Sequence, residues 1–263
     1  MLALQAAVVA APRPVGRPAW LERFHGRGWA LVPIGSIVVV VFAIRYVSDT
    51  ATGLTWLALI AVPILAAAAL GWAMRGARPP AALLAIPLFV LAWVDKTGLA
   101  GEASGAILSA LSCVTLGVLL AAVTPPGWLK VGIVLMAAAD SWLVVSDLLQ
   151  APNAALVAAS PPAGLPQLQS EIFGTVSMGY GDLFVAALLG AVLAAHWRRQ
   201  WQAALLTFAI AGVFDLLFLV ISELPATVPV ALALIVIEGY ERLSGAYRRR
   251  PSMRAGAIPR QAR

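Results

Sequence analysis

Eight apolar stretches follow one another along this chain with only short connections between them. They cover residues 30–47, 54–74, 81–95, 104–123, 128–149, 174–196, 201–221 and 225–238. A helix that crosses the hydrocarbon core of a bilayer needs about 20 mostly apolar residues. Of the 263 residues, 61% are hydrophobic and 11% are charged, whereas soluble domains carry about 25% charged residues. The sequence therefore predicts an all-α, polytopic transmembrane helix bundle of about eight spans.

Four segments follow from the positions of these stretches. They are a basic N-terminal segment, 1–28; four spans, 29–127; four further spans, 128–238, which include the longest connection, 150–173; and a basic tail, 239–263. The first eleven residues are apolar, but no basic region precedes them, so we interpret them as an interfacial or disordered tail rather than a cleaved signal peptide. The arginine-rich end of the chain is predicted to be disordered.

Positive charges occur in alternate connections. They are Arg13, Arg17, Arg23 and Arg27 before the first stretch, Arg75 and Arg78, Lys130, Arg198 and Arg199, and the six arginines from Arg248 to Arg263. Lysine and arginine are enriched in cytoplasmic loops. We therefore expect both termini in the cytoplasm and the connection 150–173 on the outer side. The shortness of the connections favours a prokaryotic inner (plasma) membrane.

Other residue types exclude several kinds of site. The single cysteine, Cys113, cannot form an internal disulfide or a cysteine-based metal cluster, and His25 and His196 are too far apart in sequence to suggest a pair of metal ligands. The net charge of +6 comes mostly from terminal arginines, which indicates membrane topology rather than nucleic-acid binding. We expect no metal, no cofactor and no nucleic-acid partner.

Four acidic side chains lie inside predicted spans rather than at their last residue. They are Asp140, Asp147, Asp182 and Asp215. A charge at the centre of a bilayer costs at least about 2.5–3.5 kcal/mol, so such residues are candidate functional groups. No lysine or arginine lies deep enough in these spans to pair with them, so they must be protonated, face water or share protons. Two carboxyl groups that share a proton form the catalytic unit of aspartic proteases.

Each acid also has a purely structural interpretation. Asp147 lies near the outer end of its span, which is typical of a solvated helix-end residue. Asp215 fits a buried, protonated hydrogen-bonding group. Asp182 follows Gly179 and Gly181, and the bare backbone of two glycines allows close approach either by another helix or by a substrate. The first case would make Asp182 incidental to helix packing.

The residues around Asp182 resemble a known motif. Residues 178–182 read MGYGD before an apolar helix, which resembles the GxGD motif of the presenilin and signal peptide peptidase family of intramembrane aspartyl proteases. The preceding span carries Asp140 in AAADSWLVV, where the family has a Tyr-Asp pair. Two spans after the motif, ELPATVPVALALI stands where the family has Pro-Ala-Leu. The resemblance covers residues 128–238, a presenilin-like catalytic core in the C-terminal half.

This resemblance implies roles for individual residues. Asp140 and Asp182 correspond to the catalytic pair, and Asp147, seven residues beyond Asp140 on nearly the same helix face, is the alternative partner. The motif and the conformational element beside the active site are Gly179, Tyr180, Gly181, Pro225, Ala226 and Thr227. Ala139 replaces the family's tyrosine, Thr227 replaces its leucine, and eight spans are counted where the family has nine. The implied reaction is hydrolysis of peptide bonds within transmembrane segments or signal-peptide remnants, by an Asp pair and water.

The two prolines near the last span allow two interpretations. Proline disfavours helix in the residue before it, so the segment 223–229 is either an extended edge that pairs with an unwound substrate or a tight turn between spans.

Three other functions are weighed against this protease. Prepilin peptidases also use GxGD, but they usually follow it with Val-Lys, where this chain has Leu183 and Phe184. A proton-coupled transporter would use the four acids as a relay, although the sequence has no internal repeat of the kind transporters carry. A noncatalytic relative that binds membrane segments fits the changes at Ala139 and Thr227. The lipid bilayer is the common partner of all these functions, and the sequence does not indicate an oligomeric state.

Overall fold

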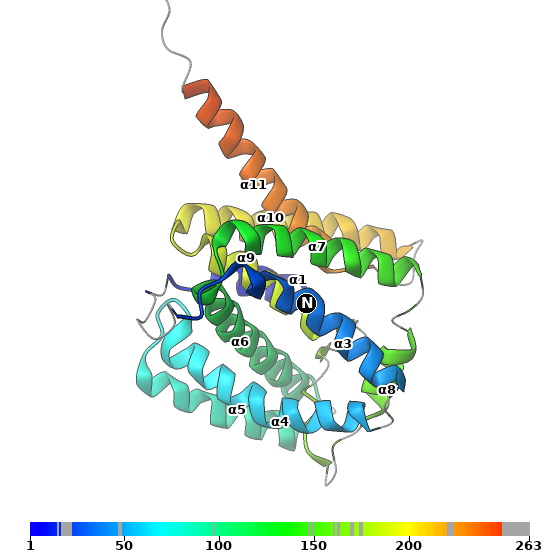
Figure 1. The fold of residues 1–263 in the computed structure, drawn as a ribbon. Helices are drawn as coiled ribbons and strands as arrows, with labels where there is room; N and C mark the ends of the chain where they lie inside the picture. Colours follow the sequence, from blue (N-terminus) through cyan, green and yellow to red (C-terminus); the bar gives the residue numbers. More distant parts are fainter. Residues whose placement is uncertain are drawn as a thin grey trace, which may run out of the picture.

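The computed structural model describes residues 1–14, 16, 23–46, 49–96, 98–146, 148, 150–159, 161, 164–168, 171–173, 176–219 and 224–248. The α-helices are α1 (Leu2–Ala10), α3 (Val32–Tyr46), α4 (Thr50–Ala68), α5 (Ala85–Val94), α6 (Leu99–Val123), α7 (Pro126–Val145), α8 (Gln150–Ala158), α9 (Tyr180–Leu193), α10 (Trp197–Asp215) and α11 (Thr227–Arg248). Short segments adjoin them: the 3-10 helices η1 (Arg27–Leu31), η3 (Pro79–Leu84) and η5 (Leu216–Leu219) and the π-helix η2 (Ala69–Ala73). The described chain is thus a helical bundle (Figure 1) with one pair of three-residue strands.

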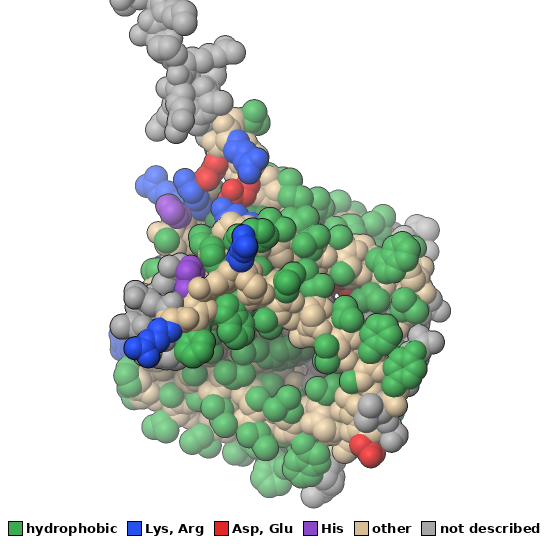
Figure 2. All heavy atoms as spheres, in the orientation of Figure 1, with side chains coloured by type: hydrophobic (Ala, Val, Ile, Leu, Met, Phe, Trp, Pro, Cys, Tyr) green, Lys and Arg blue, Asp and Glu red, His purple; other side chains and the backbone are tan. Residues whose placement is uncertain are grey.

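Four of the described helical stretches are long and apolar enough to cross a membrane. They are Arg27–Ile44, Thr50–Ala73, Leu99–Val123 and Pro126–Val145, and two shorter apolar stretches are Pro79–Val94 and Tyr180–Leu193. Large apolar side chains cover much of the face shown in Figure 2. The exposed large apolar residues of the bundle include Phe42, Trp56, Ile60, Leu135 and Phe208. An apolar surface of this extent is unfavourable in water. The fold is therefore that of an all-α bundle suited to a membrane.

A helical segment lies within each of the eight predicted apolar stretches, but the sixth begins late. Its helix, α9, starts at Tyr180, because the antiparallel strands β1 (Glu171–Phe173) and β2 (Val176–Met178) precede it. The β-branched and aromatic residues of these strands favour an extended backbone. The connection 150–173, predicted to be an outer loop, contains the helix α8.

The helix α9 occupies the centre of the bundle. It contacts α1, α6, α7, α10 and α11, and most of its residues from Leu183 onward are buried. Two glycines allow its closest neighbours to approach. A Cβ on Gly117 of α6 would lie 2.9 Å from the backbone of Ala187, and a Cβ on Gly190 would lie 2.2 Å from the carbonyl oxygen of Val9 in α1. The glycines that pack helices together are therefore outside the GxGD motif.

The interpretation of the first eleven residues as an interfacial or disordered tail is wrong. These residues form α1, which packs against α9 and α10 and buries Gln5, Val8 and Val9. The side-chain amide of Gln200 donates hydrogen bonds to the carbonyl oxygens of Val9, at 3.0 Å, and Pro12, at 2.9 Å. An uncharged apolar segment gains more by burial between helices than by remaining at an interface.

Two hydrogen bonds to connecting segments identify the two ends of the bundle. At the basic end, the guanidinium group of Arg75 donates a hydrogen bond to the carbonyl oxygen of Ala194 at 2.6 Å. At the opposite end, the hydroxyl of Thr55 donates to the carbonyl oxygen of Ala159, in the connection 150–173, at 3.2 Å. The helix α4 thus begins at one end and finishes at the other. Lysine and arginine side chains gather toward one side of the view in Figure 2.

The helix α11 continues well past the predicted start of the tail at residue 239. It ends at Arg248 and projects from the bundle in Figure 1. Two ion pairs hold it, one between Lys130 of α7 and Glu238, the other between Arg199 of α10 and Glu241. The remainder of the predicted disordered tail lies outside the described residues.

Candidate active site

Three helices bring the predicted site residues to one place inside the bundle. The helices α7, α9 and α11 contact one another, and they carry Asp140, Asp182 and Thr227 respectively. The hydroxyl of Thr227 donates a hydrogen bond to Oδ2 of Asp140 at 2.6 Å. The carboxyl groups of Asp140 and Asp182 are near enough for the charge of one to act on the other. The structure therefore brings together the two acids that the sequence pairs.

The start of α9 fixes the carboxyl group of Asp182. Gly179 is the N-cap, with an extended backbone, and its N–H group donates to Oδ2 of Asp182 at 3.1 Å. This is the usual way in which an acidic residue in the first turn satisfies a free backbone N–H group. Tyr180 anchors the same turn to α6, because its hydroxyl lies 2.7 Å from the hydroxyl of Ser112, with either one as donor.

The two glycines of the motif face open space rather than another helix. No described heavy atom lies within 4 Å of the position that a Cβ on Gly181 would take, apart from the chain's own neighbouring backbone. A Cβ on Gly179 would meet only the carboxyl group of Asp182, at 3.2 Å. The helix-packing interpretation of these glycines is therefore not supported, and the open side of Gly181 leaves room for another backbone.

The start of α11 fixes the carboxyl group of Asp140. Leu224 and Pro225 are not helical, Ala226 forms a turn, and the helix begins at Thr227. The prediction of an extended segment through residue 229 is wrong there, because Pro229 lies in the first helical turn, where a backbone N–H group is not needed. The N-terminus of a helix favours a nearby negative charge. Asp140 lies at the N-terminus of α11, as Asp182 lies at that of α9.

Donors at two helix N-termini hold the two carboxyl groups. Oδ2 of Asp140 accepts from the hydroxyl of Thr227, and Oδ2 of Asp182 accepts from the N–H group of Gly179. The carboxyl group of Asp140 also accepts from the backbone N–H group of Thr227. Two carboxyl groups held in this way on neighbouring helices form a candidate site for a water molecule between them.

The other two acids are not part of this arrangement. Asp147, the alternative partner of Asp182, lies outside the described residues. Asp215 is the last residue of α10 and is exposed, so its interpretation as a buried hydrogen-bonding group is wrong. No hydrogen bond or ion pair within the described part of the chain joins Asp215 to Asp140 or Asp182.

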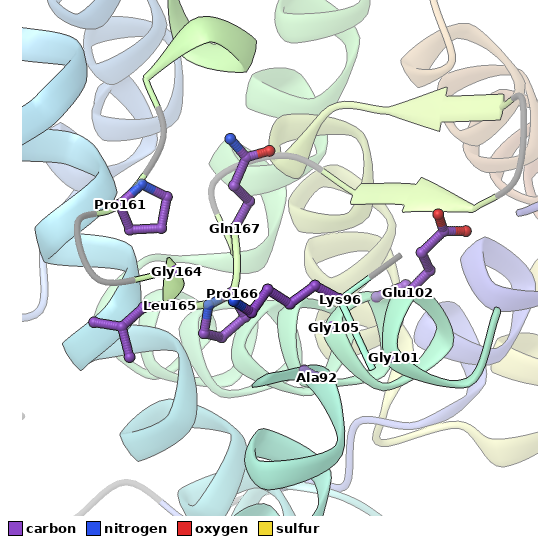
Figure 3. Close-up of a pocket in the computed structure, with 11 residues that line it drawn as sticks. Ala92, Lys96, Gly101, Glu102, Gly105, Pro161, Gly164, Leu165, Pro166 and Gln167 are labelled. Carbon is purple, nitrogen blue, oxygen red and sulfur yellow. The ribbon is translucent and has the colours of Figure 1, made fainter. Parts of the chain in front are cut away.

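A separate cavity of about 390 Å³ opens between the end of α5, the start of α6 and the segment 161–167. Its lining includes the charged residues Lys96 and Glu102 and several glycines and prolines (Figure 3). Neither Asp140 nor Asp182 lines it. The cavity therefore lies apart from the paired acids.

Sequence reasoning missed two residues that support the site. Ser112 holds Tyr180, and the side-chain amide of Gln5 donates to the carbonyl oxygen of Ala226 at 2.8 Å. A signal existed for Gln5, because it is the only polar side chain in the first eleven residues and buried amides are nearly always hydrogen-bonded. Its partner, 221 residues away, has no signal in the sequence.

Comparisons of this chain with models of protein families, with curated proteins and with solved structures find no match. Among the described residues, no group of three His, Cys, Asp or Glu side chains is arranged to hold a metal ion. The function is therefore inferred from the residues of the site and from the motif they resemble.

Proposed function

We propose that this chain is an intramembrane aspartyl protease that resembles the presenilin and signal peptide peptidase family. The observation that carries the proposal is the position of Asp140 and Asp182 on helices that contact each other, with the carboxyl group of Asp140 bound to Thr227 of a third helix that contacts both. The hydroxyl and backbone N–H groups of Thr227 hold Asp140, and the N–H group of Gly179 holds Asp182.

The proposed reaction uses the pair as acid and base. One carboxylate takes a proton from water while the other, protonated, donates to the carbonyl oxygen of the scissile peptide. The water oxygen bonds to the carbonyl carbon and gives a neutral tetrahedral diol. Collapse of the diol breaks the C–N bond, and a proton passes to the leaving nitrogen through the same pair. In this reaction the pair shares one proton, which moves between Asp140 and Asp182 as water is deprotonated and the leaving nitrogen is protonated.

The short length of α9 supports access of water to the pair. Its 14 residues extend about 21 Å, less than the roughly 30 Å of a hydrocarbon core. With its C-terminus at the basic end, its N-terminus lies below the opposite membrane surface. Non-helical backbone at that depth is tolerated where it is buried in protein or lines a water-filled cavity. Such a cavity would supply the reacting water.

The strands before α9 offer a place for the substrate. A helix hides its peptide bonds, so a transmembrane substrate must unwind before cleavage and find new backbone partners. The strand β2 ends at Met178, directly before Gly179. A substrate that adds to β2 as a third strand would continue past the open side of Gly181 toward Asp182. This explains why the motif needs glycine there.

The proposed topology has eight spans, with both termini and the basic end in the cytoplasm of a prokaryotic cell. That polarity resembles signal peptide peptidase and is opposite to that of presenilin. The favoured substrates would be single-span segments with cytoplasmic N-termini, including signal-peptide remnants. Reporter tags at the two ends test the polarity, and tags accessible only from outside the cell would contradict it.

A cleavage assay tests the proposed function. The purified chain is reconstituted in liposomes with a transmembrane peptide, and the products are identified by mass spectrometry. We expect cleavage within the apolar part of the peptide and inhibition by a hydroxyethyl isostere, which mimics the tetrahedral diol. Proton flux that depends on Asp215, without cleavage of any of several peptides, would instead support the transporter.

Substituting Gly181→Ala is expected to leave the fold intact and to lower cleavage by about tenfold or more. The new methyl group meets no described atom of the protein, and alanine is favoured over glycine within helices by about 1 kcal/mol. However, the new methyl group would occupy the space beside Asp182 through which the substrate backbone is proposed to pass. Thermal unfolding and peptide cleavage are measured on the same preparation. Unchanged cleavage would contradict this path for the substrate.

A further inference from the structure

We propose that the helix α1 belongs to the active site, where Gln5 positions the turn at Ala226 and Thr227 and, through that turn, the carboxyl group of Asp140. This inference rests on the proposed function and extends it to a segment that has no counterpart in the motif. Gln5 is a positioning residue here, because it touches neither Asp140 nor Asp182 directly.

A chain of two hydrogen bonds connects α1 to the acid. The side chain of Gln5 is 1% exposed, and its Nε2 donates to the carbonyl oxygen of Ala226 at 2.8 Å. The next residue, Thr227, is 3% exposed and donates its hydroxyl to Oδ2 of Asp140 at 2.6 Å. The orientation of the Ala226 peptide therefore determines where the hydroxyl of Thr227 points.

The turn has few other means of holding its shape. Pro225 and Pro229 lack backbone N–H groups, which removes two donors from the five residues 225–229. Within the described chain, the turn retains a bond from the N–H group of Val228 to the carbonyl oxygen of Pro225, at 3.2 Å. From other elements, it receives the bond from Gln5 of α1 and makes its own bond to Asp140 of α7.

The helix α1 itself is anchored independently of this bond. Gln200 donates to the carbonyl oxygens of Val9 and Pro12, and Gly190 allows the backbone of α1 to lie against α9. These contacts hold the other end of α1 in place. Gln5 is therefore presented from a fixed helix, so the bond to Ala226 constrains the turn more than it constrains α1.

Hydrogen exchange tests this placement without any assay of activity. Gln5→Met keeps the length of the side chain and removes the donor, and Val8→Ala loosens packing of the buried face of α1 without removing a hydrogen-bond donor. We expect Gln5→Met to speed deuterium uptake of a peptide covering residues 224–232 by about five- to tenfold, the effect of one lost hydrogen bond. Val8→Ala keeps the hydrogen bond from Gln5 to Ala226 and should leave that peptide unchanged. Equal uptake in wild type and Gln5→Met would overturn the proposal.

Coupled substitutions then test the effect on catalysis. We expect Gln5→Met and Thr227→Val each to lower kcat by about tenfold with an unchanged KM, with active enzyme counted by inhibitor titration. Because both act through the same hydroxyl, the double variant should be no slower than Thr227→Val alone. Thr227→Ser, which keeps the hydroxyl, should retain activity. Multiplied losses of about a hundredfold would show that Gln5 acts elsewhere.

The hydrogen-exchange and kinetic experiments distinguish a failure of this inference from a failure of the proposed function. If the wild-type chain cleaves no transmembrane peptide, the protease proposal fails, while the exchange measurement still decides whether Gln5 holds the turn. If the wild type cleaves and both experiments give the overturning result, the protease proposal stands and the role of α1 is rejected.

Discussion

Asp182→Asn and Asp140→Asn are each expected to abolish peptide cleavage, with losses of about a thousandfold or more. Asparagine matches the shape of aspartate but neither accepts nor donates the catalytic proton, and proton transfer alone contributes up to about 10⁴ in rate. The side-chain oxygen of asparagine still accepts the bond from Gly179 or Thr227. The fold should therefore persist, and the loss should appear in kcat. Cleavage rates and melting temperatures are compared with those of the wild type.

Two further aspartates provide matched controls for this result. Asp215→Asn changes an exposed residue at the end of α10 and should cleave at the wild-type rate. Asp147→Asn should also cleave, since Asp140 is the acid that meets Asp182. Loss of activity in Asp147→Asn with activity retained in Asp140→Asn would reverse the pairing. Activity retained in Asp182→Asn would reject the aspartyl protease altogether.

Gly190→Ala is expected to destabilise the bundle by about 1–3 kcal/mol, the usual cost of overpacking a close contact. The new Cβ would lie 2.2 Å from the carbonyl oxygen of Val9 and 3.0 Å from the ring of Pro12. Both belong to the backbone or ring of the N-terminal segment and cannot swing aside, so α1 must move away from α9. Thermal unfolding in detergent measures the loss of stability.

A second helical glycine serves as the control for Gly190→Ala. Gly212 lies in α10, and no described atom lies within 4 Å of the position of its Cβ. Gly212→Ala should therefore stabilise the helix by up to about 1 kcal/mol. A melting temperature for Gly190→Ala as high as that for Gly212→Ala would contradict the close packing of α1 against α9.

The sequence predicts the helices of this fold better than their ends. Apolar runs of about 20 residues have few alternatives to helix in a membrane, and a helix lies within each predicted stretch. The start of α9 was placed too early because the residues directly before it, GTVSMG, carry no charge that would mark the end of the apolar stretch. The helix α1 was missed because nine apolar residues are too few to indicate a span, and its burial depends on contacts with distant segments.

The candidate site was predictable only in part, for a related reason. Asp140 and Asp182 attract attention because acids are costly in a membrane, and the motif around Asp182 selects them as a pair. The sequence drew attention to Thr227 only because the family has leucine at that position, and it gave no sign that Thr227 binds Asp140. The hydrogen bond from its hydroxyl to Asp140 depends on the way α7 and α11 cross, and a local sequence pattern does not predict that crossing. The same holds for Gln5 and its partner Ala226, in the turn before α11.

The brevity of the Pro79–Val94 stretch has a consequence for the lipid around it. Its 16 residues, of which the first six form the 3-10 helix η3, extend roughly 27 Å, a little less than the roughly 30 Å of a hydrocarbon core, and its side chains Ile86, Val90 and Val94 are exposed. Acyl chains beside a short hydrophobic face compress, and the headgroup layer moves inward. On this flank the bilayer is therefore expected to be thinner than elsewhere, so that Lys96, just beyond α5, meets hydrated headgroups instead of hydrocarbon.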